Sequence, residues 1–192
     1  MDKAAETRTL AIQALTDPPP ASLLAVPLDY IHAEHFRHRT MCSVLDTLCR
    51  QDKVDINLLE AAVFFLANDF AVHLIDEEED LYPLLRRRAK PDDDIAKVLE
   101  GLNQDKAPDR FDPETIVAAI TNRQSDGDRQ FDAETSALVT RFAANEHRHL
   151  ICENAILLPL ARARLTPDDL RNLGRRIAAR RGIPYPEASD AH

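Results

Sequence analysis

Six ionisable side chains occupy positions of this chain where helical periodicity requires residues of the protein core. They are three imidazoles and three carboxylates: His35, His73, Glu77, Asp105, His149 and Glu153. An ionised carboxylate inside a core is very costly unless a partner or a cation compensates its charge. Imidazole nitrogens and carboxylate oxygens are also common ligands of transition metals. The pattern therefore predicts a metal site buried between helices.

Four of these residues form two pairs with the same spacing. Glu77 follows His73 by four residues, and Glu153 follows His149 by four residues. Residues four apart lie on one face of an α-helix, so both members of a pair are able to reach a single centre. His35 and Asp105 fall on other predicted helices, where each takes the corresponding place in one half of the chain.

The two pairs belong to an internal repeat. Residues 73–88 read HLIDEEEDLYPLLRRR and residues 149–164 read HLICENAILLPLARAR, with nine of sixteen aligned positions identical. Pro83 and Pro159 occupy the same place in the two copies, although proline inside a helix costs ~3 kcal/mol. The repeat predicts two helix pairs related by a pseudo-two-fold axis. Their ligand sets would face each other, as a dinuclear site requires.

Long amphipathic helices must carry these residues, because apolar positions recur in steps of three and four. Pro27, Asp112-Pro113 and Thr166-Pro167 are typical helix starts. No segment has the alternation expected of a strand. The predicted helices cover about 27–50, 56–89, a third segment from Pro91 that breaks near Pro108 and restarts at Asp112, about 132–165, and a short fifth helix over 166–181.

Four long segments with narrow apolar stripes predict an all-α fold, specifically a four-helix up-down bundle. We expect the bundle to cover 27–165. Residues 1–26 form an N-terminal extension with a short helix that ends at Pro18-Pro19-Pro20. Residues 166–192 form a short C-terminal helix and a tail.

Composition excludes several functional classes. Only 4 glycines are present, too few and too scattered for a Gly-rich phosphate loop. The balance of 24 basic against 33 acidic residues, a net charge of −9, argues against a nucleic-acid partner. No membrane association is expected, because no apolar stretch of ~18 residues and no signal peptide is found. The 3 cysteines lack zinc-site spacing and fit a reducing cytoplasm.

With these features the chain resembles the hemerythrin-like, or HHE cation-binding, domains, especially their bacterial branch with two bridging glutamates. The resemblance covers about 28–165 and rests on the run AEHFRHRTMC, the two His-x-x-x-Glu pairs and the run DEEEDLYPLL. It implies a non-haem di-iron centre inside the bundle. The implied roles are binding or sensing of dioxygen or nitric oxide, or a part in the iron or redox stress response.

The resemblance also implies a set of ligands. The residues that match family ligands are His35, His73, Glu77, His149 and Glu153, whereas Asp105 stands where the family has histidine. Glu77 and Glu153 would bridge two iron ions, with His35 and His73 mainly on one and His149 and Asp105 on the other. An aspartate there adds negative charge, which lowers the reduction potential and favours sensing, scavenging or oxidation over reversible oxygen carriage. Ligand binding rather than turnover is the expected activity, and no catalytic residue is identified.

The residues leave other interpretations open. His38 also lies on the apolar stripe and is an alternative ligand or a partner of one. Asp105 could instead cap a helix end near Pro108. A ferritin-like di-iron oxidase needs two Glu-x-x-His motifs, and only Glu146 with His149 supplies one. A zinc hydrolase lacks its His-Glu-x-x-His motif. A helical regulatory or interaction module with a degenerate metal site is the alternative without metal.

The remaining charged and sulfur-bearing residues are given ordinary structural roles. Asp76, Glu78, Glu79 and Asp80 are expected to form a solvated helix face. The arginines at 86–88 and at 175, 176, 180 and 181 are expected to complement helix dipoles at C-terminal ends. Cys42, Cys49 and Cys152 are expected to be small core residues rather than ligands.

Overall fold

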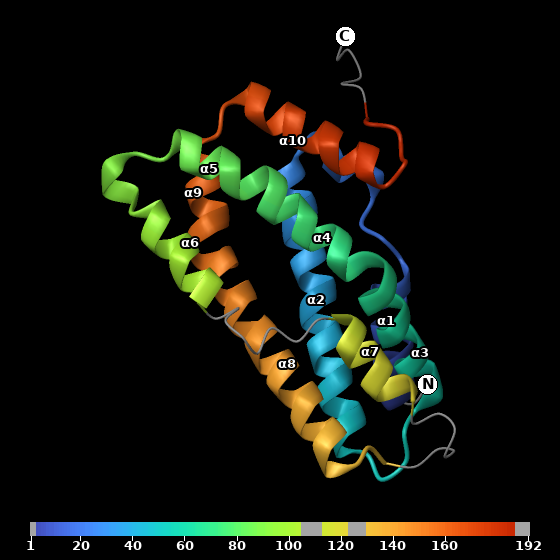
Figure 1. Cartoon of the computed structure of the whole chain (residues 1–192). Coiled ribbons are helices and arrows are strands. Elements are labelled where there is room, and N and C mark those ends of the chain that lie inside the picture. Colours follow the sequence, from blue (N-terminus) through green and yellow to red (C-terminus); the bar gives the residue numbers. More distant parts are fainter. Residues whose placement is uncertain (1–2, 105–112, 123–129, 187–192) are drawn as a thin grey trace. The chain divides into compact units, whose positions relative to one another are not determined.

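The computed structural model describes residues 3–104, 113–122 and 130–186. Within these ranges the regular structure is helical and no strand occurs, which confirms the all-α prediction. The α-helices are α1 (Lys3–Thr16), α2 (Pro27–Arg50), α3 (Ile56–Phe65), α4 (Ala71–Ile75), α5 (Tyr82–Arg88), α6 (Ile95–Gln104), α7 (Pro113–Thr121), α8 (Ala133–Cys152), α9 (Leu158–Arg164) and α10 (Pro167–Arg180). Two 3-10 turns, η1 (Ala21–Ala25) and η4 (Pro91–Asp93), and three π turns, η2 (Leu66–Phe70), η3 (Asp76–Leu81) and η6 (Glu153–Leu157), complete the list (Figure 1).

Helix starts follow from local capping. Helix α2 begins at Pro27, as predicted, because proline tolerates the first helical position. The Asp55 carboxylate accepts hydrogen bonds from the backbone N–H groups of Asn57 and Leu58 and so caps α3. Thr166 and Asp169 form a reciprocal capping box at the start of α10. These side chains satisfy N–H groups that the first turn of a helix leaves without intrahelical partners.

Two π turns precede the repeated prolines. The N–H of Tyr82 donates to the carbonyl of Glu77, and the N–H of Leu158 donates to the carbonyl of Glu153, so each bond spans five residues. Proline next in the chain has no N–H to donate and would crowd the carbonyl four residues earlier in a regular α-helix. The wider turn changes the hydrogen-bond register before the proline, and the two copies of the repeat do so at the same place. Such π turns are frequent at functional sites.

The described residues fall into two compact units, and the first contains the described parts of Met1–Pro18, Phe36–Ala71 and Pro108–Leu150. Within this unit α1 packs against α3, and α7 packs against α3 and η2. The buried guanidinium of Arg37 donates to the carbonyl oxygen of Leu15 at 2.9 Å. This bond ties the end of α1 to α2.

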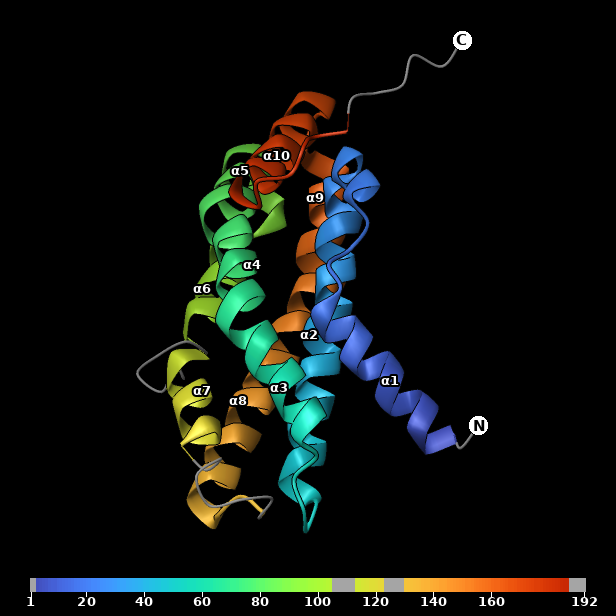
Figure 2. The same ribbon diagram turned by 90° about the vertical axis from the view of Figure 1, so that its right-hand side faces the viewer.

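The second unit contains the described parts of Pro19–His35, Val72–Ala107 and Ile151–His192. Within it α5 packs against α6 and α9, and α10 packs against η1 and η3; Figure 2 shows α10 beside α5. Gly174 permits the close approach of α10 to η1, since a Cβ atom at this position would lie 2.2 Å from the carbonyl oxygen of Leu24. Glycine is used where two backbones come this close.

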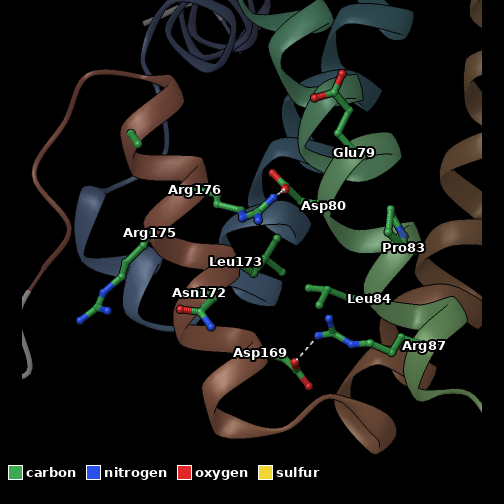
Figure 3. Close-up of a pocket in the computed structure, with 11 residues that line it drawn as sticks. Glu79, Asp80, Pro83, Leu84, Arg87, Asp169, Asn172, Leu173, Arg175 and Arg176 are labelled. Atoms are coloured by element: carbon green, nitrogen blue, oxygen red, sulfur yellow. Dashed lines mark hydrogen bonds and ion pairs between the residues drawn. The ribbon is translucent and has the colours of Figure 1, made fainter.

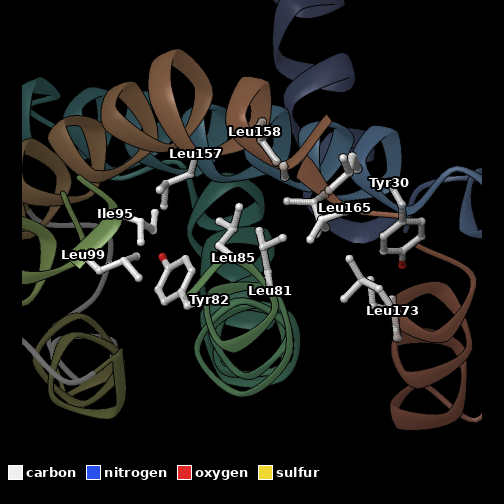
Figure 4. Packing of buried hydrophobic residues seen from close by; sticks show 14 of the residues in the cluster. Tyr30, Leu81, Tyr82, Leu85, Ile95, Leu99, Leu157, Leu158, Leu165 and Leu173 are labelled. Carbon is white, nitrogen blue, oxygen red and sulfur yellow. The ribbon is translucent and has the colours of Figure 1, made fainter. Parts of the chain in front are cut away.

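A continuous apolar core holds the second unit together (Figure 4). Leu81 and Leu85 project from η3 and α5 toward Leu157 and Leu158 of the other repeat copy. All four side chains are buried. Leu81 and Leu157 occupy the same position in the two copies of the repeat, four residues after Glu77 and Glu153, so the contact holds η3 and η6 beside the predicted ligands.

One long helix also passes a simple test for a membrane span. Ile56–Arg88 is long and apolar enough by length and composition alone. Core helices of soluble proteins share this length and composition, and 44% of the apolar window is buried inside the protein.

Acid should weaken one ion pair of the second unit. Arg164 binds Asp93 through two hydrogen bonds of 2.7 Å, which lowers the pKa of this carboxyl from 3.8 to about 2. A depressed pKa contributes stability that is present above the ordinary value and lost as pH falls through the lowered one. We expect Asp93→Asn to lower the free energy of unfolding at neutral pH and to lose this deficit between about pH 4 and pH 2. Urea unfolding of both proteins across this range is the measurement, with the exposed Asp92→Asn as control. A deficit that does not change with pH would exclude this role.

Candidate metal centre

Three side chains from three helical segments converge inside the second unit. His35 lies on α2, His73 on α4 and Glu77 on the π turn η3. Their ligand atoms all lie within 4.8 Å of one another, and the three residues are buried. The Nε2 atoms of His35 and His73 lie 2.9 Å and 3.4 Å from Oε1 of Glu77. The two imidazole rings meet edge to face with centroids 5.1 Å apart.

The Glu77 carboxylate and the His73 imidazole shift each other's pKa. Burial alone would raise the pKa of Glu77, but the imidazoles of His73 and His35 outweigh it and hold that pKa well below its ordinary value. Burial alone would lower the pKa of His73, but the Glu77 carboxylate outweighs it and raises that pKa. The cluster therefore keeps an anionic carboxylate between two imidazoles in a site sheltered from water.

Glu153 joins the same cluster from the second copy of the repeat. Its Oε2 lies 3.7 Å from Nε2 of His35, and its Oε1 accepts a hydrogen bond from the Tyr82 hydroxyl. Burial and the nearby carboxylates of Glu77 and Glu153 raise the pKa of Tyr82 well above its ordinary value. The phenol thus stays protonated and serves as a donor to Glu153.

The donor set fits a transition-metal ion. Two imidazole nitrogens and two carboxylates meet in a buried volume, a combination that suits iron and related ions better than calcium or magnesium. The Nδ1 of His35 lies 3.1 Å from the amide oxygen of Asn154. A proton on Nδ1 donated to this oxygen leaves Nε2 of the same ring as the atom that faces Glu77. Metal-binding histidines are usually oriented by such a bond on the other ring nitrogen.

The other predicted ligands belong to the first unit or fall outside the described residues. His149 is buried on α8, in the first unit, four residues before Glu153 in the sequence. Asp105 lies outside the described residues. His38 belongs to the first unit, where its Nδ1 is 2.7 Å from a carboxylate oxygen of Glu146. The ring of Phe70 stacks on it with centroids 4.8 Å apart.

Sequence reasoning missed three residues of this neighbourhood. Tyr82 and Asn154 contact Glu153 and His35, and the buried Glu34 raises the pKa of His73 by its charge. The repeat contains a signal for Tyr82, because the aligned position of the other copy is apolar Leu158. A polar group that replaces an apolar one at a duplicated core position is a candidate for a specific contact.

The prediction of a solvated acidic face is wrong for two of its four residues. Asp76 and Asp80 are 1% and 3% exposed, because α10 covers this side of η3. Arg180 forms ion pairs with both carboxylates, including a 2.7 Å contact with Asp80. Arg181 lies 2.6 Å from Asp76, and Arg176 lies 2.7 Å from Asp80. These arginines therefore pair across the unit rather than only complementing the dipole of their own helix.

Removal of the shared arginine should destabilise the second unit. Arg180→Gln leaves two buried carboxylates with one arginine partner each, and we expect a loss of about 1–3 kcal/mol in the free energy of unfolding. Arg171→Gln is the matched control, since Arg171 is 51% exposed and its ion pair is with the exposed Asp168 three residues earlier. Its effect should stay within about 0.5 kcal/mol. Equal urea-unfolding curves for the two variants would contradict a structural role for Arg180.

Comparison with known families agrees with this site. The sequence model of the Hemerythrin HHE cation binding domain matches residues 26–161 of the chain's 192. The matched segment contains the three convergent residues on α2, α4 and η3 as well as Glu153. No curated protein matches the chain.

Proposed function

Because the chain belongs to the hemerythrin HHE cation-binding family, we propose that it is a non-haem di-iron protein that binds or senses a diatomic ligand, dioxygen or nitric oxide. The buried convergence of His35, His73 and Glu77 is the observation that supports this proposal most strongly. The alternative role that we propose is a part in the iron or redox stress response, and we expect either role to be carried out in the cytoplasm.

Each ligand of the proposed centre has its own support. Glu77 and Glu153 would be shared by the two ions, a role supported by the position of both carboxylates beside His35. His35 and His73 would hold mainly one iron. The repeat assigns His149 to the other iron, because it stands where the first copy has His73. Asp105 is the proposed further ligand of the second iron, because of its place in the predicted third helix.

The frame of the proposed centre is a four-helix up-down bundle over 27–165, with 1–26 and 166–192 as additions. When bound, the two irons supply redox-active positions for a small ligand. The chain itself contributes three things. Its buried imidazoles and carboxylates hold the ions, Asn154 orients the His35 ring, and the Tyr82 hydroxyl holds its proton at Glu153.

Metal content tests the proposal. Protein expressed with ample iron and purified without oxygen should carry about two iron ions per chain. Its optical spectrum should change on exposure to air and, separately, to nitric oxide. A folded chain with iron content near zero would overturn the proposal and favour a helical interaction module with a degenerate site.

Asp105 provides a test of the second iron. Asp105→His should keep the iron content and raise the reduction potential, because a neutral imidazole replaces an anion beside the metal. Asp105→Ala should lower the iron content on that side. Potentiometry and metal analysis of both variants are the measurements. If Asp105→Ala leaves content, spectrum and potential unchanged, Asp105 is not a ligand, and water or His38 takes its place.

A further inference from the structure

A second candidate site lies apart from the ligand cluster, within the second unit. A pocket of about 580 Å³ opens between the η3–α5 segment and α10 (Figure 3). This volume is in the range of small-molecule sites. The pocket combines an apolar floor with charged walls, since Leu84 and the buried Leu173 face it from opposite sides.

One side of the pocket, where Arg87 and Arg88 of α5 meet Asp169 of α10, carries excess positive charge. Asp169 accepts two hydrogen bonds from Arg88, of 2.7 Å and 3.2 Å, and a third of 2.7 Å from Arg87. The charge of one arginine is enough to compensate this carboxylate, so Arg87 and Arg88 together leave one positive charge. Arg87 lines the pocket with a side chain that is 60% exposed, so its guanidinium adds charge that the protein does not neutralise there.

On the other side of the pocket an aspartate is again shared by two arginines. Asp80 pairs with Arg180 at 2.7 Å and with Arg176 at 2.7 Å. Arg180 also pairs with Asp76, which Arg181 compensates independently. Arg176 lines the pocket and is 68% exposed. The exposed carboxylate of Glu79 also lines the pocket on this side, so the excess of arginine charge is confined to the side of Arg87 and Arg88.

Arg87 and Arg176 each share their aspartate with a second arginine. An arginine that shares a carboxylate with a second arginine is able to turn to a ligand without leaving a buried charge uncompensated. Arg175 also lines the pocket, but its guanidinium lies over the ring of Tyr185, 5.6 Å from the centroid. The amide of Asn172 lines the space between the two walls.

We propose that this pocket binds a small organic anion, in which a phosphoryl or carboxyl group is joined to a compact apolar body. Arg87 and Arg176 bind the anionic group, since guanidinium forks match phosphate and carboxylate oxygens. Leu84, which is partly exposed in the pocket, contacts the apolar body. The site is independent of the metal ligands, so metal-free and iron-loaded protein both bind.

Titration of the full chain with simple probes tests this inference. Phenyl phosphate combines both features, inorganic phosphate has only the anion, and phenol has only the apolar body. In two-dimensional NMR spectra, phenyl phosphate should cause saturable shifts of the amides of α5 and α10 and bind more tightly than phosphate or phenol. Benzoate as a fourth probe shows whether carboxyl replaces phosphoryl. Absence of saturable shifts with both phenyl phosphate and benzoate at millimolar concentration would overturn the proposal.

Arginine variants locate the site. Arg87→Gln and Arg176→Gln should each raise the Kd of the binding probe about tenfold, as expected for loss of a charged hydrogen bond. Arg162→Gln is the control, because Arg162 is 51% exposed and ion-paired with Asp29 in the same unit but does not line the pocket. Its Kd should equal that of the wild type. An equal loss of affinity in all three variants would show general charge attraction and contradict a built site.

Discussion

Replacement of Glu77 by glutamine is expected to abolish most iron binding while the chain stays folded. Glu77 is the carboxylate that the imidazoles of His35 and His73 both face, at 2.9 Å and 3.4 Å. An amide has nearly the same shape but no negative charge, so it neither compensates a cation nor bridges two of them. Iron content should fall from about two ions per chain to below about one.

The control for this variant is Glu79→Gln. Glu79 belongs to the same π turn and carries the same charge, but it is exposed. Its iron content should match that of the wild type. Metal analysis and circular dichroism of both variants separate loss of a ligand from loss of the fold. Full iron content in a folded Glu77→Gln protein would exclude Glu77 as a ligand.

Leu85→Ala should produce a large loss of stability without direct contact with the ligands. Leu85 is fully buried in the core of the second unit, where it faces the leucines of the other repeat copy. Removal of a buried leucine side chain costs about 2–5 kcal/mol, from lost burial and from the cavity that remains. Urea unfolding measures this loss as a lower midpoint with an unchanged slope.

Ile156→Ala is the matched control for the core variant. Ile156 lies in the repeat and in the same unit, but it is 44% exposed. Its truncation should cost less than about 1 kcal/mol, because little apolar area is lost from the interior. If both variants lose the same free energy, Leu85 does not contribute to the core as the structure indicates.

Helix positions could be predicted from the sequence because their signals are local. Pro27 and the Thr166-Pro167 start act within one turn, and the structure begins α2 and α10 there. The π turns before Pro83 and Pro159 could not be located in this way. Apolar periodicity reports the average path of a helix, and one extra residue in a turn hardly changes it.

The convergence of the histidines and glutamates was also encoded locally. Spacing of four residues places His73 and Glu77 on one face, and the repeat indicates that Glu153 takes an equivalent place. The structure brings these three residues and His35 into one unit. His35 lies outside the repeat and was predicted from its place on the apolar stripe of the first long helix.

Burial by a helix that is distant in the sequence could not be predicted from the sequence. Asp76 and Asp80 look solvent-facing because acidic runs usually are, yet α10 packs on η3 and buries both. The partners that compensate them, Arg180 and Arg176, come from about a hundred residues away in the chain. A pairing of this range depends on the docked helix and has no local pattern. For the same reason the pocket between α5 and α10 was not predicted.

Anomalous diffraction from iron tests the central claim most directly. Crystals of the iron-loaded protein, measured above and below the iron absorption edge, locate each ion against the side chains. The account predicts anomalous density beside Nε2 of His35, Nε2 of His73 and the carboxylate of Glu77. Iron density held only by other side chains, or none in crystals of verified iron content, would contradict it.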